Sequence, residues 1–324
     1  MPAGAYNSAM QMYPLKFEPI YKHRIWGGQK LREVFGKDIP ADVRIGESWE
    51  VADLPEDKSV IANGPLAGRT LAWAVEAYRE QITGDRDFSL PFPLLIKFLD
   101  AEEVLSVQVH PDAETCRRMG KGDPKTECWY IISAPPDGLL YKGLRKGVTA
   151  GQFADSLKAG TVAELLEAVP VKPGQCHFLP AGTLHAIGPG LLVAEIQTPS
   201  DTTYRVFDWN RLDEHGKPRP LHIDEALESI HFGVCGSELP VTTTGRLVES
   251  DYFAVDKIEA DRDSQWAVSP GQMRVLIIIS GSGRIEGGRG EPVEFRAGQC
   301  LLIPADYEGV AAFSERTEYL VVTV

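Results

Sequence analysis

Short stretches in which apolar and polar residues alternate recur along the chain, and they predict a protein built mainly of β-strands. The clearest stretch is 104–110, where Ser106, Gln108 and His110 share one face and apolar residues occupy the other. Further strands are predicted over 16–26, 46–51, 91–100, 125–132 and 191–197. Apolar residues at helical spacing predict helices over 71–81, 111–119 and 223–231, and two short ones within 149–169.

An internal repeat indicates how these strands are organised. The letters PGQCHFLPA at 173–181 return as AGQCLLIPA at 297–305. Upstream, WYIIS at 129–133 is echoed by VLIIIS at 275–280. Similar strings in the same order predict two copies of one barrel, with the helices of 149–169 inserted in the first copy.

The first copy contains a turn motif of the form G-x5-P-x-G-x2-H, from Gly174 through Pro180 and Gly182 to His185. This spacing resembles the second signature of the cupin superfamily, in which the histidine is a metal ligand inside a small β-barrel. The second copy has Gly309 where the first has His185. The predicted fold class is therefore mainly β, with two cupin-type jelly-roll barrels and a few short helices in the first, metal-bearing half.

The two copies suggest two domains. Residues 1–235 are expected to form the metal-binding domain with its helical insertions. Residues 236–324 are expected to form a C-terminal cupin-like domain without metal ligands, joined to the first by a linker over 236–245.

Four side chains of the first copy form a candidate metal site. Gln108, His110, Glu127 and His185 offer two imidazoles, one carboxylate and one amide oxygen, all on the strand faces expected to point into the barrel. One such histidine is more often a packed residue, but the combination favours a metal. Nitrogen and hard oxygen donors suit Zn2+, with Mn2+, Co2+ and Fe2+ as alternatives.

Charged residues are predicted around this site. Lys97 interrupts an otherwise apolar strand, which is costly unless it faces an anion. Lys125 and Ser106 share strand faces with the proposed ligands, and Glu195 and Arg205 follow at distances that bring them to the barrel mouth. This set of groups suits a polyhydroxylated, anionic, carbonyl-bearing ligand.

Composition narrows the classes of partner and location. The 324 residues carry 33 Lys and Arg against 46 Asp and Glu, a net charge of −13, which argues against a nucleic-acid or anionic-membrane partner. No run approaches the roughly 18 apolar residues of a membrane helix. Residues 1–12 lack a secretory pattern and are expected to be a frayed end. Five cysteines without a C-x-x-C pair favour reduced thiols in a cytoplasmic protein.

Five strings carry a closer resemblance. They are PLLIKFLDA, LSVQVHPD, KTECWYII, PAGTLHAIGPGLLVAEIQ and SDTTYRVFDWNR, within a region from Phe17 to Val324. In this order they resemble the motifs of type I mannose-6-phosphate isomerase (phosphomannose isomerase) in its short bacterial form. The resemblance implies a zinc-dependent aldose–ketose isomerase that interconverts mannose 6-phosphate and fructose 6-phosphate through a cis-enediol.

The resemblance also implies roles for particular residues. Gln108, His110, Glu127 and His185 match the family's metal ligands. Arg205 matches its catalytic arginine, Lys125 a lysine proposed in proton transfer, and Glu195 an active-site carboxylate. Lys97 and Ser106 match positions near the substrate.

Some points stay open at this level. Either Glu195 or Lys125 could be the base. Cys128 and the pair Cys176-His177 depart from the usual family letters, and His177 is interpreted as a residue of the barrel wall. Two other functions fit part of the pattern: a non-haem iron oxygenase using His110, Glu127 and His185, and a non-catalytic sugar-phosphate sensor.

Overall fold

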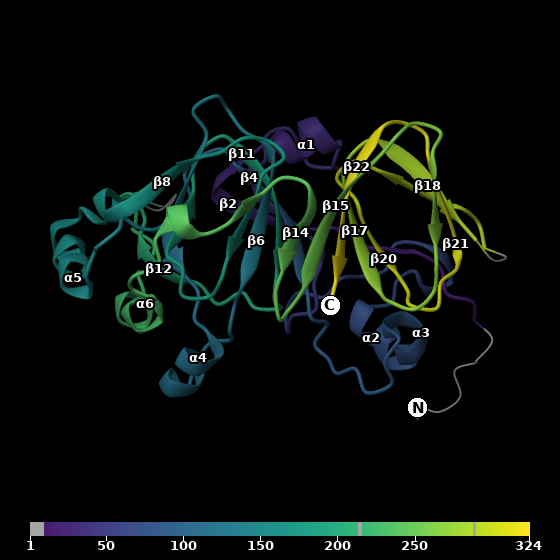
Figure 1. Cartoon of the computed structure of the whole chain (residues 1–324), viewed down its shortest axis with the longest axis horizontal. Coiled ribbons are helices and arrows are strands. Elements are labelled where there is room, and N and C mark those ends of the chain that lie inside the picture. Colours follow the sequence, from purple (N-terminus) through teal and green to yellow (C-terminus); the bar gives the residue numbers. More distant parts are fainter. Residues whose placement is uncertain (1–9, 213–215, 288–289) are drawn as a thin grey trace.

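Two β-barrels lie side by side in the computed structural model of the chain, which describes residues 10–212, 216–287 and 290–324 (Figure 1). The expected frayed end over 1–9 lies outside the described residues. The rest of that prediction is wrong, because Met12 is buried in the core.

The first barrel is made of two antiparallel sheets. One sheet contains, in spatial order, β13 (Val241–Thr242), β9 (Cys176–Leu179), β6 (Glu127–Ser133), β11 (Leu191–Gln197), β4 (Leu95–Ala101), β3 (Ile45–Val51) and β2 (Ile20–Gly28). The other contains β12 (Tyr204–Phe207), β5 (Val107–Val109), β10 (His185–Ile187), β7 (Leu139–Leu144) and β8 (Leu166–Pro170).

The second barrel repeats this plan on a smaller scale. One sheet contains β1 (Leu15–Lys16), β20 (Cys300–Ile303), β17 (Arg274–Ser280), β22 (Thr317–Thr323), β15 (Ala254–Ala260) and β14 (Gly245–Glu249). The other contains β16 (Gln265–Val268), β21 (Gly309–Phe313), β18 (Ser282–Glu286) and β19 (Val293–Arg296).

The sequence repeat corresponds to a structural repeat, which confirms the predicted fold class. β9 pairs with β6 so that Cys176 faces Tyr130, and β20 pairs with β17 so that Cys300 faces Ile277. Those are equivalent positions in the repeated strings. Gly309 begins β21 as His185 begins β10.

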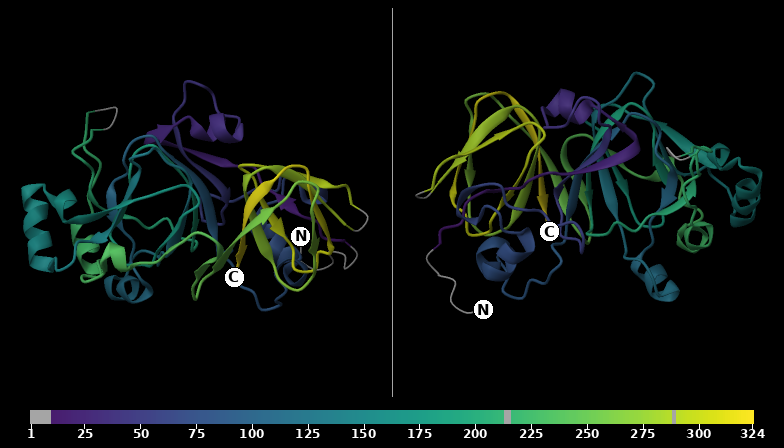
Figure 2. Two further views of the ribbon diagram at one scale, coloured as in Figure 1. Left: turned by 45° about the horizontal axis from the view of Figure 1, so that its top comes forward. Right: turned by 180° about the vertical axis from the view of Figure 1, so that it is seen from behind.

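The helices lie outside the barrels (Figures 1 and 2). They are α1 (Lys30–Phe35), α2 (Leu71–Ala77), α3 (Arg79–Thr83), α4 (Ala113–Met119), α5 (Ala150–Ala159) and α6 (Ile223–Ser229). Short 3-10 turns cover Gly64–Leu66, Val162–Leu165 and Gly236–Glu238. Local sequence sets their limits: α5 begins with a capping box of Thr149 and Gln152 and ends at Gly160, whose φ of 71° suits glycine. No helix of the described chain has the length and apolar character needed to cross a membrane.

Four predicted elements differ from the structure. The helix over 71–81 is divided at Tyr78 into α2 and α3. The second helix within 149–169 is a 3-10 turn followed by β8, because pairing with β7 overrides the helical spacing. The strand over 91–100 begins only at Leu95, since Pro91 and Pro93 have no N–H to donate. The strand over 104–110 shortens to β5.

Two strands cross the expected boundary between 235 and 236. β1 belongs to the sheet of the second barrel, and β13 extends a sheet of the first. One core cluster also contains residues of both barrels, among them Phe98 and Leu320. The boundary stays a prediction, but this exchange of strands and shared core fix the barrels against each other.

Candidate functional site

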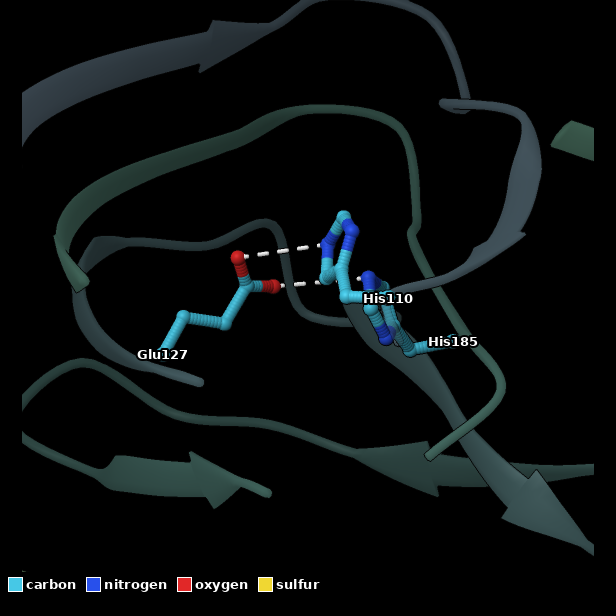
Figure 3. A group of neighbouring side chains, drawn as sticks. All are labelled: His110, Glu127 and His185. Atoms are coloured by element: carbon cyan, nitrogen blue, oxygen red, sulfur yellow. Dashed lines mark ion pairs between the residues drawn. The ribbon is translucent and has the colours of Figure 1, made fainter. Parts of the chain in front are cut away.

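Two histidines and a glutamate meet inside the first barrel (Figure 3). His110 follows β5, Glu127 begins β6 and His185 begins β10. Each offers a donor atom within 4.8 Å of the others. Nε2 of His110 is 3.4 Å from Oε2 of Glu127, and Nε2 of His185 is 3.3 Å from Oε1. Within the described chain, this is the only such grouping of three or more His, Cys, Asp or Glu side chains.

Backbone carbonyls orient both imidazoles toward this centre. Nδ1 of His110 lies 2.8 Å from the carbonyl oxygen of Thr202, and Nδ1 of His185 lies 2.8 Å from that of Thr183. A carbonyl only accepts, so each Nδ1 carries the proton and each Nε2 turns its lone pair to the centre. Nε2 of His110 and Oε1 of Glu127 have no hydrogen-bond partner among the described residues, although both are buried. Such atoms are expected where a cation binds.

Electrostatics keep these donors in their metal-binding forms at neutral pH. Burial lowers the pKa of both imidazoles, that of His185 to about 3, so both rings are neutral. Burial alone would raise the pKa of the Glu127 carboxyl, but the ammonium of Lys125, 2.9 Å away, helps to hold it well below its usual range. Two neutral imidazoles and a carboxylate fit a divalent metal.

Gln108 points its amide nitrogen, and not its amide oxygen, toward the same centre. Its Nε2 is 3.4 Å from Nε2 of His185, while its Oε1 accepts a 3.4 Å hydrogen bond from Ser106. The amide oxygen therefore joins the donor set only after a half-turn of the amide group.

A second ion pair lies next to this centre. Nζ of Lys97 is 3.1 Å from Oε1 of Glu195, whose Oε2 accepts a 2.9 Å hydrogen bond from Trp129. Burial would lower the pKa of Lys97, but Glu195, Glu47 and Asp201 together raise it, so it stays a cation. The charge in the middle of β4 is thus explained by carboxylates that face it.

A cavity of about 470 Å³ opens over these groups. Six of the residues singled out from the sequence line it: Lys97, Ser106, Gln108, Lys125, Glu195 and Arg205. Arg205 donates from Nε to Ser106 at 3.3 Å and from Nη1 to the carbonyl of Pro220 at 2.9 Å. The structure therefore brings all nine sequence-predicted residues together, three in the buried centre and six in the cavity wall.

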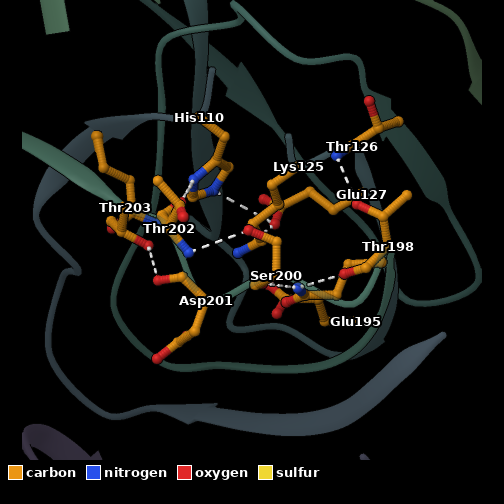
Figure 4. Close-up of polar contacts among 12 residues, drawn as sticks. His110, Lys125, Thr126, Glu127, Glu195, Thr198, Ser200, Asp201, Thr202 and Thr203 are labelled. Carbon is orange, nitrogen blue, oxygen red and sulfur yellow. Dashed lines mark hydrogen bonds and ion pairs between the residues drawn. The ribbon is translucent and has the colours of Figure 1, made fainter. Parts of the chain in front are cut away.

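The sequence patterns missed a strap beside the site, residues 198–203, whose polar contacts are drawn in Figure 4. The strap provides the carbonyl of Thr202 to His110. Gln197, fully buried, donates its amide N–H groups to the carbonyls of Thr198 and Ser200 and so shapes the turn. These contacts are made to backbone carbonyl oxygens, which every residue has, so the side-chain types in the sequence do not indicate them. The patterns also missed three charged cavity residues outside the strap, Arg24, Glu47 and Arg219.

His177 is buried in the first barrel and pairs with Val241 and Trp129 across its sheet. Neither ring nitrogen has a hydrogen-bond partner in the described part of the chain. The histidine does not belong to the group formed by His110, Glu127 and His185. Burial, and then nearby Lys142, lower its pKa to about 4.

Replacing His177 with phenylalanine should therefore make the metal-free protein more resistant to acid. The unfolded chain protonates this ring near pH 6.5, while the folded protein resists protonation down to about pH 4. In the parent protein, the contribution of this ring to the free energy of unfolding is fully present above pH 6.5 and decreases as the pH falls toward 4. At pH 5 the decrease is about 2 kcal/mol. Urea unfolding with a chelator at pH 7.5 and pH 5 measures the loss. Equal losses in the variant and the parent protein would contradict this account.

Comparisons with known proteins agree with this geometry. The family described as phosphomannose isomerase type I, catalytic domain, matches residues 14–130. A Bacillus subtilis (strain 168) protein named "Probable mannose-6-phosphate isomerase GmuF" is 41% identical over 305 residues, which cover 91% of this chain and 94% of that protein.

Solved structures extend the agreement to the fold. The crystal structure of mannose 6-phosphate isomerase from Bacillus subtilis has a TM-score of 0.86 at 31% identity, covering 97% of this chain and 100% of that one. A mannose 6-phosphate isomerase bound with zinc and yttrium shares the fold, with a TM-score of 0.73 at 19% identity over 96% of this chain and 100% of that one. The extent of the match at 41% identity places the chain in the type I phosphomannose isomerase family.

Proposed function

We propose that the protein is a metal-dependent isomerase that interconverts mannose 6-phosphate and fructose 6-phosphate. The observation that carries the proposal is the buried group of His110, Glu127 and His185 beside a cavity lined by lysine, arginine and glutamate. Relatives named mannose-6-phosphate isomerase support the choice of substrate.

His110, Glu127 and His185 would hold the metal, with Gln108 as a fourth ligand through its amide oxygen. Two imidazole nitrogens with oxygen donors favour Zn2+. The zinc bound by the solved relative supports this choice. A divalent metal supplies Lewis acidity, which polarises the sugar carbonyl and its neighbouring hydroxyl.

In the forward direction a base removes the C2 proton of the open-chain aldose, and the proton returns to C1 by way of a cis-enediol. Glu195 suits the role of base, because a carboxylate can accept a proton and this one is held in place by Lys97 and Trp129. The Nζ of Lys125 forms an ion pair with Glu127 and Lys125 lines the same cavity, so it suits proton transfer between the oxygens on C1 and C2 of the sugar. Arg205 would stabilise the negative charge that develops on those oxygens.

Comparing Glu195→Gln with Lys125→Gln tests this division of roles. We expect Glu195→Gln to lose turnover and the exchange of the C2 proton with D2O together, by roughly 1,000-fold, because glutamine cannot accept that proton. Lys125→Gln should slow turnover but retain more of the exchange. Nuclear magnetic resonance of the sugar in D2O measures both. Exchange that survives in Glu195→Gln but vanishes in Lys125→Gln would reverse the assignment.

A coupled isomerase assay with and without a chelator tests the function itself. Purified protein should interconvert the two hexose phosphates, lose activity on chelation and regain it when Zn2+ is added. A folded, metal-replete sample without turnover would refute the proposal. All five cysteines are free and buried, which agrees with the reducing conditions of the cytoplasm, the location we propose.

A further inference from the structure

Cationic side chains outnumber carboxylates in the wall of the cavity, although the protein as a whole is strongly acidic. Its wall includes five cationic side chains: Arg24, Lys97, Lys125, Arg205 and Arg219. It includes three carboxylates: Glu47, Glu195 and Asp201. The whole chain has a net charge of −13. Local positive charge attracts an anion to the cavity.

The two lysines of the cavity are already paired. Lys97 is 3.1 Å from Glu195 and 3.8 Å from Asp201, and only 3% of its surface is exposed. Lys125 is 2.9 Å from Glu127 and equally buried. Turning either ammonium toward a phosphate would leave a buried carboxylate without its partner, which is strongly unfavourable. The lysines therefore position Glu195 and Glu127 and are poor phosphate ligands.

The three arginines are placed differently. The bonds of Arg205 go to a hydroxyl and a carbonyl, and no carboxylate of the described residues forms an ion pair with it. Arg219 donates from Nε and Nη2 to the two carboxylate oxygens of Asp208, at 2.7 and 2.6 Å, which leaves its Nη1 for another acceptor. Nε of Arg24 donates to Glu47 at 2.7 Å and its Nη1 to the carbonyl of His23 at 3.3 Å, which leaves Nη2 for another acceptor.

These three guanidinium groups lie in the wall of the same cavity. Arg219 is adjacent in sequence to Pro220, whose carbonyl holds Arg205, and Arg24 lines the same cavity from β2. Burial lowers the pKa of Arg205, and the charges of Arg219 and Arg24 contribute to lowering it further, as expected for cations whose charge is not fully compensated. Guanidinium groups in such an arrangement suit a phosphate monoester, which accepts several charge-assisted hydrogen bonds.

We propose that Arg24 and Arg219 form the phosphate subsite of the cavity, and that Lys97 does not bind the phosphate. This proposal rests on the proposed function, because it takes a sugar phosphate as the ligand. The phosphate would lie where Arg24 and Arg219 line the cavity, while Arg205, which contacts Ser106 and pairs with Gln108 across β12 and β5, would face the enediolate. Gln108, which lines the cavity and contacts His185, would then meet the carbonyl end of the sugar.

The test uses the metal-loaded enzyme and the variants Arg24→Gln and Arg219→Gln. We expect KM for mannose 6-phosphate and the inhibition constant of inorganic phosphate to rise together, by roughly 10- to 100-fold, with a much smaller change in kcat. Arg44→Gln is the control, because Arg44 pairs with Glu103 at 2.9 Å outside the cavity and its removal changes net charge equally. Unchanged phosphate inhibition in both cavity variants would overturn the proposal.

Two further measurements keep the outcomes separate. Arg219→Gln leaves Asp208 with fewer partners, so Arg219→Lys, which keeps the charge but loses the planar fork, replaces it if the glutamine variant unfolds. It should still weaken phosphate binding. If Lys97→Met folds but is no longer inhibited by phosphate, then Lys97 and not the arginines binds the phosphate. Calorimetric binding of inorganic phosphate needs no turnover: binding weakened by Arg24→Gln in a protein without isomerase activity would sink the proposed function and leave the subsite standing.

Discussion

Glu127→Gln is expected to abolish isomerase activity and to weaken metal binding by at least about 100-fold. Glutamine has nearly the same shape, but it removes the only negative charge among His110, Glu127 and His185, the charge that attracts a divalent cation. Turnover should fall by more than about 1,000-fold, because without the metal the sugar carbonyl is no longer polarised. Competition with a chromogenic chelator measures affinity, and a coupled assay measures turnover.

The substitution also leaves the buried ammonium of Lys125 without its carboxylate, so some loss of stability is expected. Glu50→Gln controls for this effect. Glu50 is also buried and pairs with Lys37 at 2.7 Å, outside the cavity lining. Loss of metal in Glu127→Gln alone, with similar decreases of Tm in both, would assign the effect to the site. Wild-type turnover by Glu127→Gln would remove this carboxylate from the mechanism.

Side-chain parity on the strands could be read from the sequence because it depends only on local geometry. Successive residues of a strand point to opposite faces, so Ser106 and Gln108 had to lie together, and so did Lys125 and Glu127. The structure has both pairs in contact. The same holds for the repeat: equal letters at 173–181 and 297–305 gave equal strand pairing in the two barrels.

Features that depend on distant chain segments could not be read in this way. β1 has two residues, too few for any periodicity, yet it completes the sheet of the other barrel. The pairing of Lys97 with Glu195 follows from the register of β4 and β11, which no local pattern fixes. The carbonyl of Thr202 orients His110 although every residue offers a carbonyl, so only the course of the strap selects it. These features are determined by tertiary contacts and not by the local sequence.

Arg205→Ala is expected to keep the fold and the metal but to lose turnover by roughly 100- to 1,000-fold. The fold should survive because the described partners of Arg205, the hydroxyl of Ser106 and the carbonyl of Pro220, are neutral, so no buried carboxylate loses an ion pair. The metal should remain because its proposed ligands accept no hydrogen bond from this guanidinium. Turnover should fall because the charge that balances the enediolate is gone.

Three measurements on one preparation decide the matter: the thermal midpoint, the bound metal and kcat. Arg145→Ala is a matched control, since Arg145 also donates from Nε to a backbone carbonyl, that of Leu166 at 3.2 Å, but lies outside the cavity. Arg205→Lys separates charge from geometry: a lysine restores positive charge without the planar fork, so it should recover only part of kcat. A kcat unchanged in Arg205→Ala would show that the cation at this position takes no part in the proton transfer, and the charge of the enediolate would then have to be balanced by the metal and Lys125.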